Sequence, residues 1–280
     1  MSETPHRRPI GRDAVVTARE LVLSRSGRVV LEIGDAAIAP GVTVLIGPNG
    51  SGKSTLLDAI AGLLEPSQGT LSVLGAEPSV VRRQIAYVLQ AQGAPAGLPV
   101  TVREIVTLGR AAERGAFGRI TAGDRHHVDN AIDRLDLGHL TTRHLSELSG
   151  GERQRTFVAQ GLAQQADVLL LDEPTAGLDM ASMDRIRLVL AEERAAGRTI
   201  IVASHDLTDA AAADRVLLVA GRLVASGTPG DVLTREHLAA AYAGRMLGFD
   251  DRALVLDEDH HGDDRHDDLE VTAPSAPQPR

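Results

Sequence analysis

Short apolar runs alternate with stretches of helical spacing over most of this 280-residue chain. The apolar runs are nearly continuous, which is typical of strands buried on both faces of a sheet. Helical spacing separates the last three of these runs, and this alternation predicts an α/β fold with a parallel sheet covered by helices. The predicted strands are Val42–Ile46, Val168–Leu171, Thr199–Ala203 and Arg215–Ala220.

The N-terminal part follows a different pattern. From Val15 to about Ile38, apolar and polar residues alternate, which predicts antiparallel strands with one buried face. Two further strand-like runs follow at Thr70–Leu74 and Gln84–Val88. Residues 1–14 show neither pattern and are predicted to be a disordered N-terminus. We therefore expect an N-terminal antiparallel β subdomain beside the parallel sheet.

A helical subdomain is predicted within the sheet sequence, over about residues 90–165. It opens with a connector rich in Gly, Pro and Ala, Ala91–Pro99, which marks a change of subdomain. Thr101–Arg110 and Ala122–Leu137 then carry apolar residues at helical spacing. The folded domain as a whole is predicted to span residues 15–248.

Residues 249–280 form an acidic tail that contains histidine, aspartate and proline. Such a composition is typical of a solvated, disordered extension, which is the favoured interpretation. Three histidines among carboxylates in the segment 257–268 leave weak binding of a divalent metal as the alternative.

Composition excludes several kinds of protein. The chain has no cysteine, so it has neither disulfides nor thiolate metal sites. A net charge of -9 without a basic tract argues against a nucleic-acid surface. The N-terminus lacks an apolar run long enough for a signal peptide, and no stretch is long enough to cross a bilayer. We expect a cytosolic chain unless a membrane partner holds it.

A glycine-rich loop joins the Val42–Ile46 strand to a helix predicted over Ser54–Leu64, and it contains Lys53, the only lysine among 29 basic side chains. The loop matches the pattern G-x-x-x-x-G-K-[ST], in which backbone N–H groups and a helix N-terminus cradle phosphates. Lys53 would reach the β- and γ-phosphates, and the Ser54 hydroxyl would ligate Mg²⁺. The candidate nucleotide-binding residues are Gly47, Pro48, Asn49, Gly50, Ser51, Gly52, Lys53, Ser54 and Thr55.

Two adjacent carboxylates, Asp172 and Glu173, end the strand that begins at Val168. Neighbouring residues at a strand end point in different directions, so the two acids can serve two purposes. Asp172 would anchor Mg²⁺, and Glu173 would orient the water that attacks the γ-phosphate. A polar turn after a core strand is the alternative, and the phosphate loop in the same chain favours the catalytic interpretation.

A second phosphate-binding edge is predicted at Ser149, Gly150 and Gly151, which precede a helical run from Glu152 to about Ala163. A hydroxyl and backbone amides at a helix N-terminus can bind an anion, although Ser-Gly-Gly alone would be interpreted as a helix cap. Two such edges in one chain predict that two domains share a nucleotide.

Together these motifs resemble the ATP-binding subunits of ABC transporters, from about Val15 to about Leu247. The matching elements, in order, are the Walker A loop at Gly47–Thr55, the glutamine loop at Gln90, the signature at Leu148–Gln154, Walker B at Val168–Asp172 with Glu173, the D-loop at Ala176–Asp179 and the switch histidine His205. The resemblance implies a P-loop NTPase fold with a RecA-like parallel sheet core.

The resemblance also implies an activity and partners. Two copies would form a head-to-tail homodimer with ATP and Mg²⁺ between the Walker A loop of one subunit and the signature of the other. ATP hydrolysis would drive integral membrane permease subunits and, indirectly, an extracytoplasmic solute-binding protein. The chain would be a peripheral subunit at the cytoplasmic face of the cell membrane.

Further residue roles come from the resemblance alone. Gln90 would reach Mg²⁺ and the attacking water, His205 would contact the γ-phosphate, and Asp179 would contact the opposing subunit. In this chain the stretch before Walker A offers no aromatic ring to stack on adenine, and Arg25 is the expected replacement, because a guanidinium plane can lie over a base. Leu89 stands where a proline commonly precedes the loop glutamine.

The transported solute is indicated by weaker likenesses. The segments 99–110, 114–119 and 238–247 look like importers of zinc or manganese, and somewhat less like importers of ferric siderophores, haem or cobalamin. An exporter is a competing interpretation, but the chain lacks a fused membrane domain. A soluble ABC ATPase acting on nucleic acid or ribosomes, or a P-loop kinase, would explain fewer of the motifs.

Overall fold

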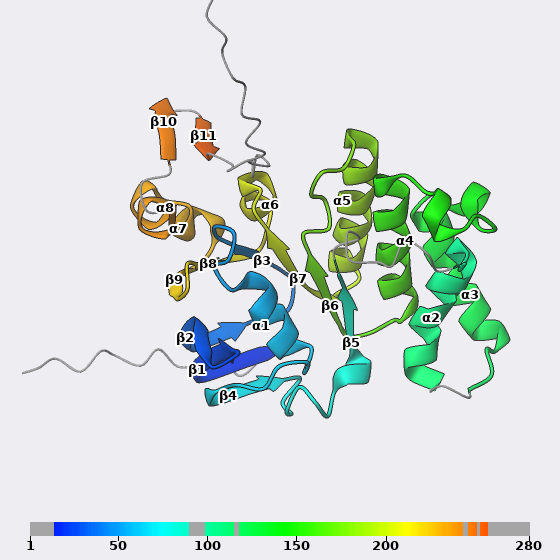
Figure 1. The fold of residues 1–280 in the computed structure, drawn as a ribbon, viewed down its shortest axis with the longest axis horizontal. Helices are drawn as coiled ribbons and strands as arrows, with labels where there is room; N and C mark the ends of the chain where they lie inside the picture. Colours follow the sequence, from blue (N-terminus) through cyan, green and yellow to red (C-terminus); the bar gives the residue numbers. More distant parts are fainter. Residues whose placement is uncertain (1–13, 90–98, 115–117, 243–245, 251–252, 257–280) are drawn as a thin grey trace, which may run out of the picture. The chain divides into compact units, whose positions relative to one another are not determined.

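A computed structural model describes residues 14–89, 99–114, 118–242, 246–250 and 253–256 of the chain. It divides the chain into two units, Met1–Gly244 and Arg245–Arg280, which are described separately. Figure 1 shows the order of the elements along the chain.

The first unit is built on a six-stranded sheet of order β5-β6-β7-β3-β8-β9. The first five strands in this order run parallel, and β9 pairs antiparallel with β8. Their bounds are β3 Val42–Ile46, β5 Ile85–Val88, β6 Val168–Asp172, β7 Thr199–Ser204, β8 Arg215–Val219 and β9 Leu223–Gly227. The predicted parallel α/β sheet is confirmed, and its order brings the carboxyl ends of β6, β7 and β3 side by side.

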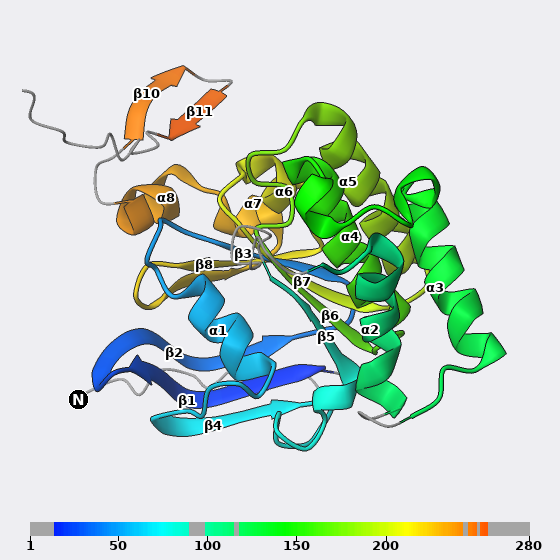
Figure 2. The ribbon, with the colours of Figure 1, turned by 45° about the vertical axis from the view of Figure 1, so that its right-hand side comes forward.

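A second sheet, of order β2-β1-β4, confirms the predicted antiparallel strands in the N-terminal part. Its strands are β1 Val16–Arg25, β2 Arg28–Ile38 and β4 Gln68–Val73. Helix α1, Lys53–Ile60, lies between the two sheets (Figure 2). Leu56, Leu57 and Ile60 of this helix are buried in one apolar cluster with residues of both sheets. The helix that follows the glycine-rich loop is therefore fixed by the core on two sides.

The remaining helices of the first unit are α2 Val102–Arg114, α3 Ala122–Arg134, α4 Gly150–Ala163, α5 Met180–Ala195, α6 Leu207–Ala211, α7 Pro229–Val232 and α8 Arg235–Tyr242, with 3-10 turns at Arg82–Gln84, Gly138–Leu140 and Leu145–Glu147. Helices α2, α3 and α4 pack against one another. The predicted helical segment therefore contains three mutually packed helices among the described residues.

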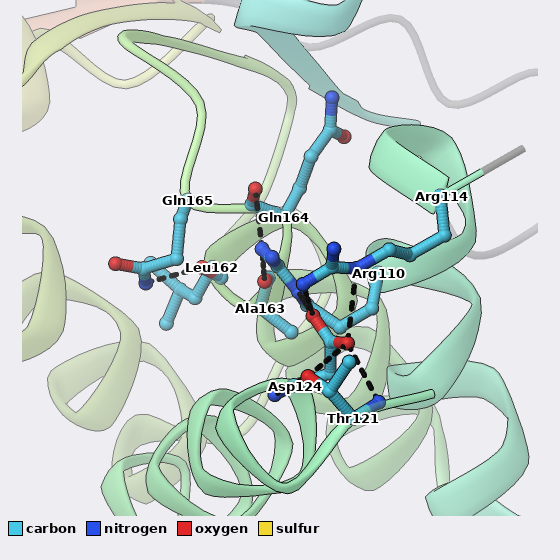
Figure 3. A network of polar contacts seen from close by, with 8 residues as sticks. All are labelled: Arg110, Arg114, Thr121, Asp124, Leu162, Ala163, Gln164 and Gln165. Atoms are coloured by element: carbon cyan, nitrogen blue, oxygen red, sulfur yellow. Dashed lines mark hydrogen bonds and ion pairs between the residues drawn. The ribbon is translucent and has the colours of Figure 1, made fainter. Parts of the chain in front are cut away.

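A buried ion pair joins these three helices (Figure 3). Arg110 on α2 donates to Asp124 at 2.9 Å and to the carbonyl oxygens of Ala163 and Gln164 at 3.0 Å each. The carboxylate of Asp124 also accepts hydrogen bonds from Arg114 and from the backbone and hydroxyl of Thr121. Both sides of this buried charge pair are hydrogen-bonded, as a charge removed from water requires.

Several helix boundaries differ from the predictions, and α3 for example ends at Arg134 rather than Leu137. Helix α1 ends at Ile60 rather than Leu64, because Gly62 adopts a left-handed conformation (φ 72°) and terminates it. Helix α2 continues to Arg114, beyond the predicted Arg110. Helix α4 begins at Gly150 rather than Glu152, since the Ser149 side chain caps it.

The second unit contains a short antiparallel hairpin of β10, Met246–Asp250, and β11, Ala253–Leu256. The prediction that residues 249–280 are disordered is therefore wrong for the part of the tail in these strands. Two apolar runs separated by Asp251 and Arg252 form a hairpin pattern that the acidic composition of the tail obscured. Residues 1–13 and 257–280, including the proposed metal-binding histidines, lie outside the described residues.

A helix that crosses a lipid bilayer is long and predominantly apolar. Within the described residues, no helix combines the length and the apolar character needed to span a membrane.

Candidate active site

A pocket of about 300 Å³ opens at the glycine-rich loop. Its walls come from the loop, from the first turn of α1, from β2 and from the end of β6. The lining residues are Val30, Asn49, Gly50, Ser51, Gly52, Lys53, Ser54, Thr55 and Glu173. The predicted phosphate loop and one of the two predicted acids therefore share a single cavity. Val30 was missed by the sequence analysis, because nothing in its local pattern distinguishes it from other strand residues.

Glycine is required at two positions of the loop for different physical reasons. A Cβ atom on Gly47 would lie 1.9 Å from the carbonyl oxygen of Val219, so the loop packs directly on the β8 backbone. Gly52 has a φ of 101°, and a Cβ there would lie 2.9 Å from the Cβ of Leu31. A side chain at either position would force the backbone to move.

The Lys53 side chain lies inside the loop and is only 6% exposed. Its ammonium group donates to the carbonyl oxygens of Gly47 at 2.7 Å and Pro48 at 3.2 Å. Burial lowers the pKa of Lys53, and the negative charges of Glu173 and Asp172 oppose that effect. The loop thus holds one cation at the centre of a polar cavity.

The N-terminus of α1 lacks a side-chain cap, because its N-cap residue is Gly52. By contrast, Thr121, Ser149 and Asp179 cap α3, α4 and α5 through their side chains. The first N–H groups of a helix have no partner within it, so an uncapped start that opens on a pocket is suited to an anion.

The two adjacent acids after β6 have different environments. Burial raises the pKa of Asp172, and the interaction of its carboxyl group with the Ser54 side chain opposes that effect. Glu173 adopts a left-handed backbone conformation (φ 46°), and its N–H donates to the carbonyl oxygen of Ala203 at 2.9 Å. This unusual conformation for a non-glycine residue accompanies the placement of the Glu173 side chain in the pocket.

His205 follows β7 and lies beside Glu173, with 3.6 Å between its Nδ1 and the Oε2 of the carboxylate. The polar interaction with the neighbouring His205 imidazole is the main cause that lowers the pKa of Glu173. This interaction favours the negatively charged form of Glu173. The pairing depends on β6 and β7 being neighbours in the sheet, which the sequence of either strand alone does not reveal.

The predicted second edge forms the N-terminus of α4. Ser149 and Glu152 make a reciprocal capping box, with distances of 2.8 Å and 3.3 Å. Nothing lies within 4 Å of a Cβ built on Gly150, whereas one on Gly151 would lie 2.4 Å from the hydroxyl of Ser182. Among the described residues, the lining of the phosphate-loop pocket does not include this edge.

Asp179 caps α5 and accepts hydrogen bonds from the backbone and the hydroxyl of Ser182, at 2.9 Å and 2.8 Å. Its predicted contact with an opposing subunit stays a prediction.

Arg25, at the end of β1, donates to the Thr55 hydroxyl at 3.2 Å and forms an ion pair with Asp58. These bonds place its guanidinium next to a residue of the pocket wall. Gln90, predicted to reach Mg²⁺ and water, lies outside the described residues.

The sequence profile of the ABC transporter family matches residues 37–176. A manganese transport system ATP-binding protein of Halalkalibacterium halodurans is 39% identical, over 78% of this chain and 87% of the relative. A zinc transport system ATP-binding protein of Treponema pallidum is also 39% identical, over 82% and 88% of the two chains.

Among solved structures, a metal-chelate type ABC transporter in an inward-facing conformation is similar, with a TM-score of 0.72 and 27% identity over 82% of this chain and 89% of that one. The cbiO1 subunit of a Clostridium perfringens ABC transporter complex gives a TM-score of 0.68 and 29% identity, over 82% and 94%. The phosphate loop, the paired acids and the similarity to these relatives lead to the same conclusion. The chain belongs to the family of ATP-binding subunits of ABC transporters and is an ATPase.

Proposed function

We propose that this chain powers the import of a divalent metal ion, zinc or manganese, through separate membrane permease subunits. The observation that carries the proposal is the similarity to ATP-binding proteins of manganese and zinc transport systems over most of the length of both chains. A metal chelate is the second candidate, favoured by the likeness to a metal-chelate type transporter.

The donor set in the pocket fits Mg²⁺. Ser54 and Asp172 offer oxygen ligands whose side chains interact with each other. Burial and the charge of Glu173 both disfavour a negative charge on Asp172, and a bound cation would offset that cost. We propose that Ser54 and Asp172 hold the ion, with Gln90 as a third ligand. Bound Mg²⁺ would neutralise charge on the β- and γ-phosphate oxygens.

The residues of this chain account for the other requirements of hydrolysis. The loop amides and the uncapped start of α1 bind the phosphates, and Lys53 transfers its hydrogen bonds from the loop carbonyls to the β- and γ-oxygens. The Glu173 carboxylate accepts a hydrogen bond from water and aligns it with the γ-phosphorus. Water forms the new P–O bond and gives a proton to Glu173 as the bond to the leaving β-phosphate oxygen breaks, and His205 contacts the γ-phosphate.

We propose that a second copy of the chain completes the site. Ser149, Gly150 and Gly151 of one copy would bind the γ-phosphate held by the other, since a hydroxyl that accepts a hydrogen bond can still donate its proton. The open space around Gly150 leaves room for that approach. This head-to-tail dimer would dock on permease subunits at the cytoplasmic face of the membrane, and the permease would receive solute from an extracytoplasmic binding protein.

The domain limits are part of the proposal. We propose an ATPase domain over residues 15–248, with an inserted helical subdomain over about residues 90–165.

Arg25 is proposed to face the adenine ring. Its guanidinium is held by Thr55 and Asp58, so it presents a fixed plane beside the pocket. We expect Arg25→Ala to weaken ATP binding by about fivefold, which corresponds to a cation–π contact of about 1 kcal/mol. Because a stacking contact tolerates any base, GTP binding should weaken similarly. Titration of the variant with both nucleotides checks this, and unchanged affinities would remove Arg25 from the base site.

The transported solute is tested by ATP hydrolysis in the native complex, purified through a tag on this chain and reconstituted in lipid with its solute-binding protein. We expect zinc or manganese to raise the turnover, and magnesium-matched controls without these metals to show only the basal rate. Stimulation by ferric chelates alone would favour the second candidate. The absence of stimulation by any of them would contradict metal import.

A further inference from the structure

The ion pair between Arg187 and Asp209 supports the chain on both sides of His205. The residue before it, Ser204, is 3% exposed, and its hydroxyl donates to the Asp209 carboxylate at 2.9 Å. The residue after it, Asp206, donates its backbone N–H to the same Ser204 hydroxyl at 3.0 Å. The backbone that carries the imidazole is therefore fixed at Ser204, and Ser204 is fixed by Asp209.

Arg187 on α5 completes this arrangement. Its Nη2 donates to Asp209 at 2.7 Å and to Asp206 at 2.9 Å, and its Nε donates to Asp209 at 3.0 Å. One planar guanidinium thus bridges a carboxylate on α6 and the N-cap carboxylate of the same helix. Such a fork geometry restricts orientation more than a single ion pair does.

The network also reaches the segment that carries Glu173. The hydroxyl of Thr175, two residues after Glu173, donates to Asp209 at 3.4 Å. The Asp209 carboxylate therefore contacts both polypeptide segments whose side chains meet in the Glu173–His205 pair. Its side chain is only 12% exposed, so these bonds are largely shielded from water.

We propose that Asp209, oriented by Arg187, is a positioning residue that sets the distance between His205 and Glu173. The inference rests on the proposed roles of that pair in ATP hydrolysis. Asp209 does not line the phosphate-loop pocket described here, so it would act on turnover through His205 and leave nucleotide binding to the loop.

The test compares Asp209→Asn with the unaltered chain. We expect turnover to fall on the order of tenfold, the effect of a displaced catalytic group, while the ATP dissociation constant and KM change little. Arg187→Met should reproduce the effect, and Arg187→Lys should recover part of it. Arg194→Met is the matched control. Arg194 also lies on α5 and pairs with an aspartate, Asp214, and this pair does not contact the His205 segment.

A double-mutant cycle separates positioning from a general loss of structure. In a His205→Ala background, Asp209→Asn should have almost no further effect on single-turnover hydrolysis, because its target is gone. An equal loss in both backgrounds, or a loss as large in Arg194→Met, would overturn the inference. The proposed function has a separate test, which is whether substitutions of Lys53 and Glu173 abolish ATP hydrolysis. If hydrolysis needed neither residue, both the proposed function and this inference would be overturned.

Discussion

Glu173→Gln is expected to bind ATP with unchanged affinity and to lose at least about 100-fold in turnover, which is within the range attributed to a general base. The amide has the size and shape of the carboxylate, so the pocket keeps its form. It carries no charge, however, and so cannot pair with His205 or polarise a water molecule as the carboxylate does. With ATP bound but not cleaved, two copies should remain together.

Phosphate release measured on the purified chain gives the turnover, and titration with ATP gives the affinity. Glu192→Gln is the matched control, since Glu192 lies half-exposed on α5 and pairs with Arg134. Turnover of Glu173→Gln equal to that of this control would remove Glu173 from the catalytic role.

Lys53→Met should reduce ATP affinity at least about 100-fold, because charge-assisted hydrogen bonds to phosphate in a shielded cavity are individually worth about 1.5–3 kcal/mol and Lys53 makes more than one. The free energy of unfolding should change by less than about 2 kcal/mol. Methionine removes a buried cation whose burial is unfavourable, which offsets the two hydrogen bonds lost to Gly47 and Pro48.

Lys53→Arg retains the positive charge and should nevertheless bind ATP poorly, since the broad guanidinium fork does not fit inside the loop that encloses the lysine stem. Calorimetric titration and thermal unfolding measure both effects. Arg103→Met removes an exposed cation on α2 and serves as the control. Wild-type affinity in Lys53→Met would exclude the phosphate contact.

The sequence predicted the parts of the fold that depend on local pattern. Strands β3, β6, β7 and β8 are continuous apolar runs, so their existence could be inferred without knowing their neighbours. The order of these strands could not, because it depends on contacts between distant segments. The helix ends at Ile60 and Gly150 were missed for a local reason, namely the left-handed Gly62 and the Ser149 cap.

The sequence predicted the site to about the same extent as the fold. The phosphate loop has a linear pattern, and the structure places nearly all of it in one pocket. The left-handed conformation of Glu173 and its approach to His205 arise from the sheet edge, where β6 and β7 end together. In the sequence, Val30 is an ordinary strand residue and Asp58 an ordinary helix residue. Only packing brings Val30 to the nucleotide pocket and Asp58 to Arg25.

The claim that one ATP lies between two copies has a direct test, because the chain contains no cysteine. Asn49→Cys and Gly150→Cys, each in the Glu173→Gln background, place single thiols at exposed positions of the loop and of the α4 N-terminus. A mixture of the two variants, treated with a short bis-maleimide, should form a cross-linked dimer with ATP and Mg²⁺ and almost none without nucleotide. Cross-linking that is absent with ATP, or equal without it, would contradict a site shared by two subunits.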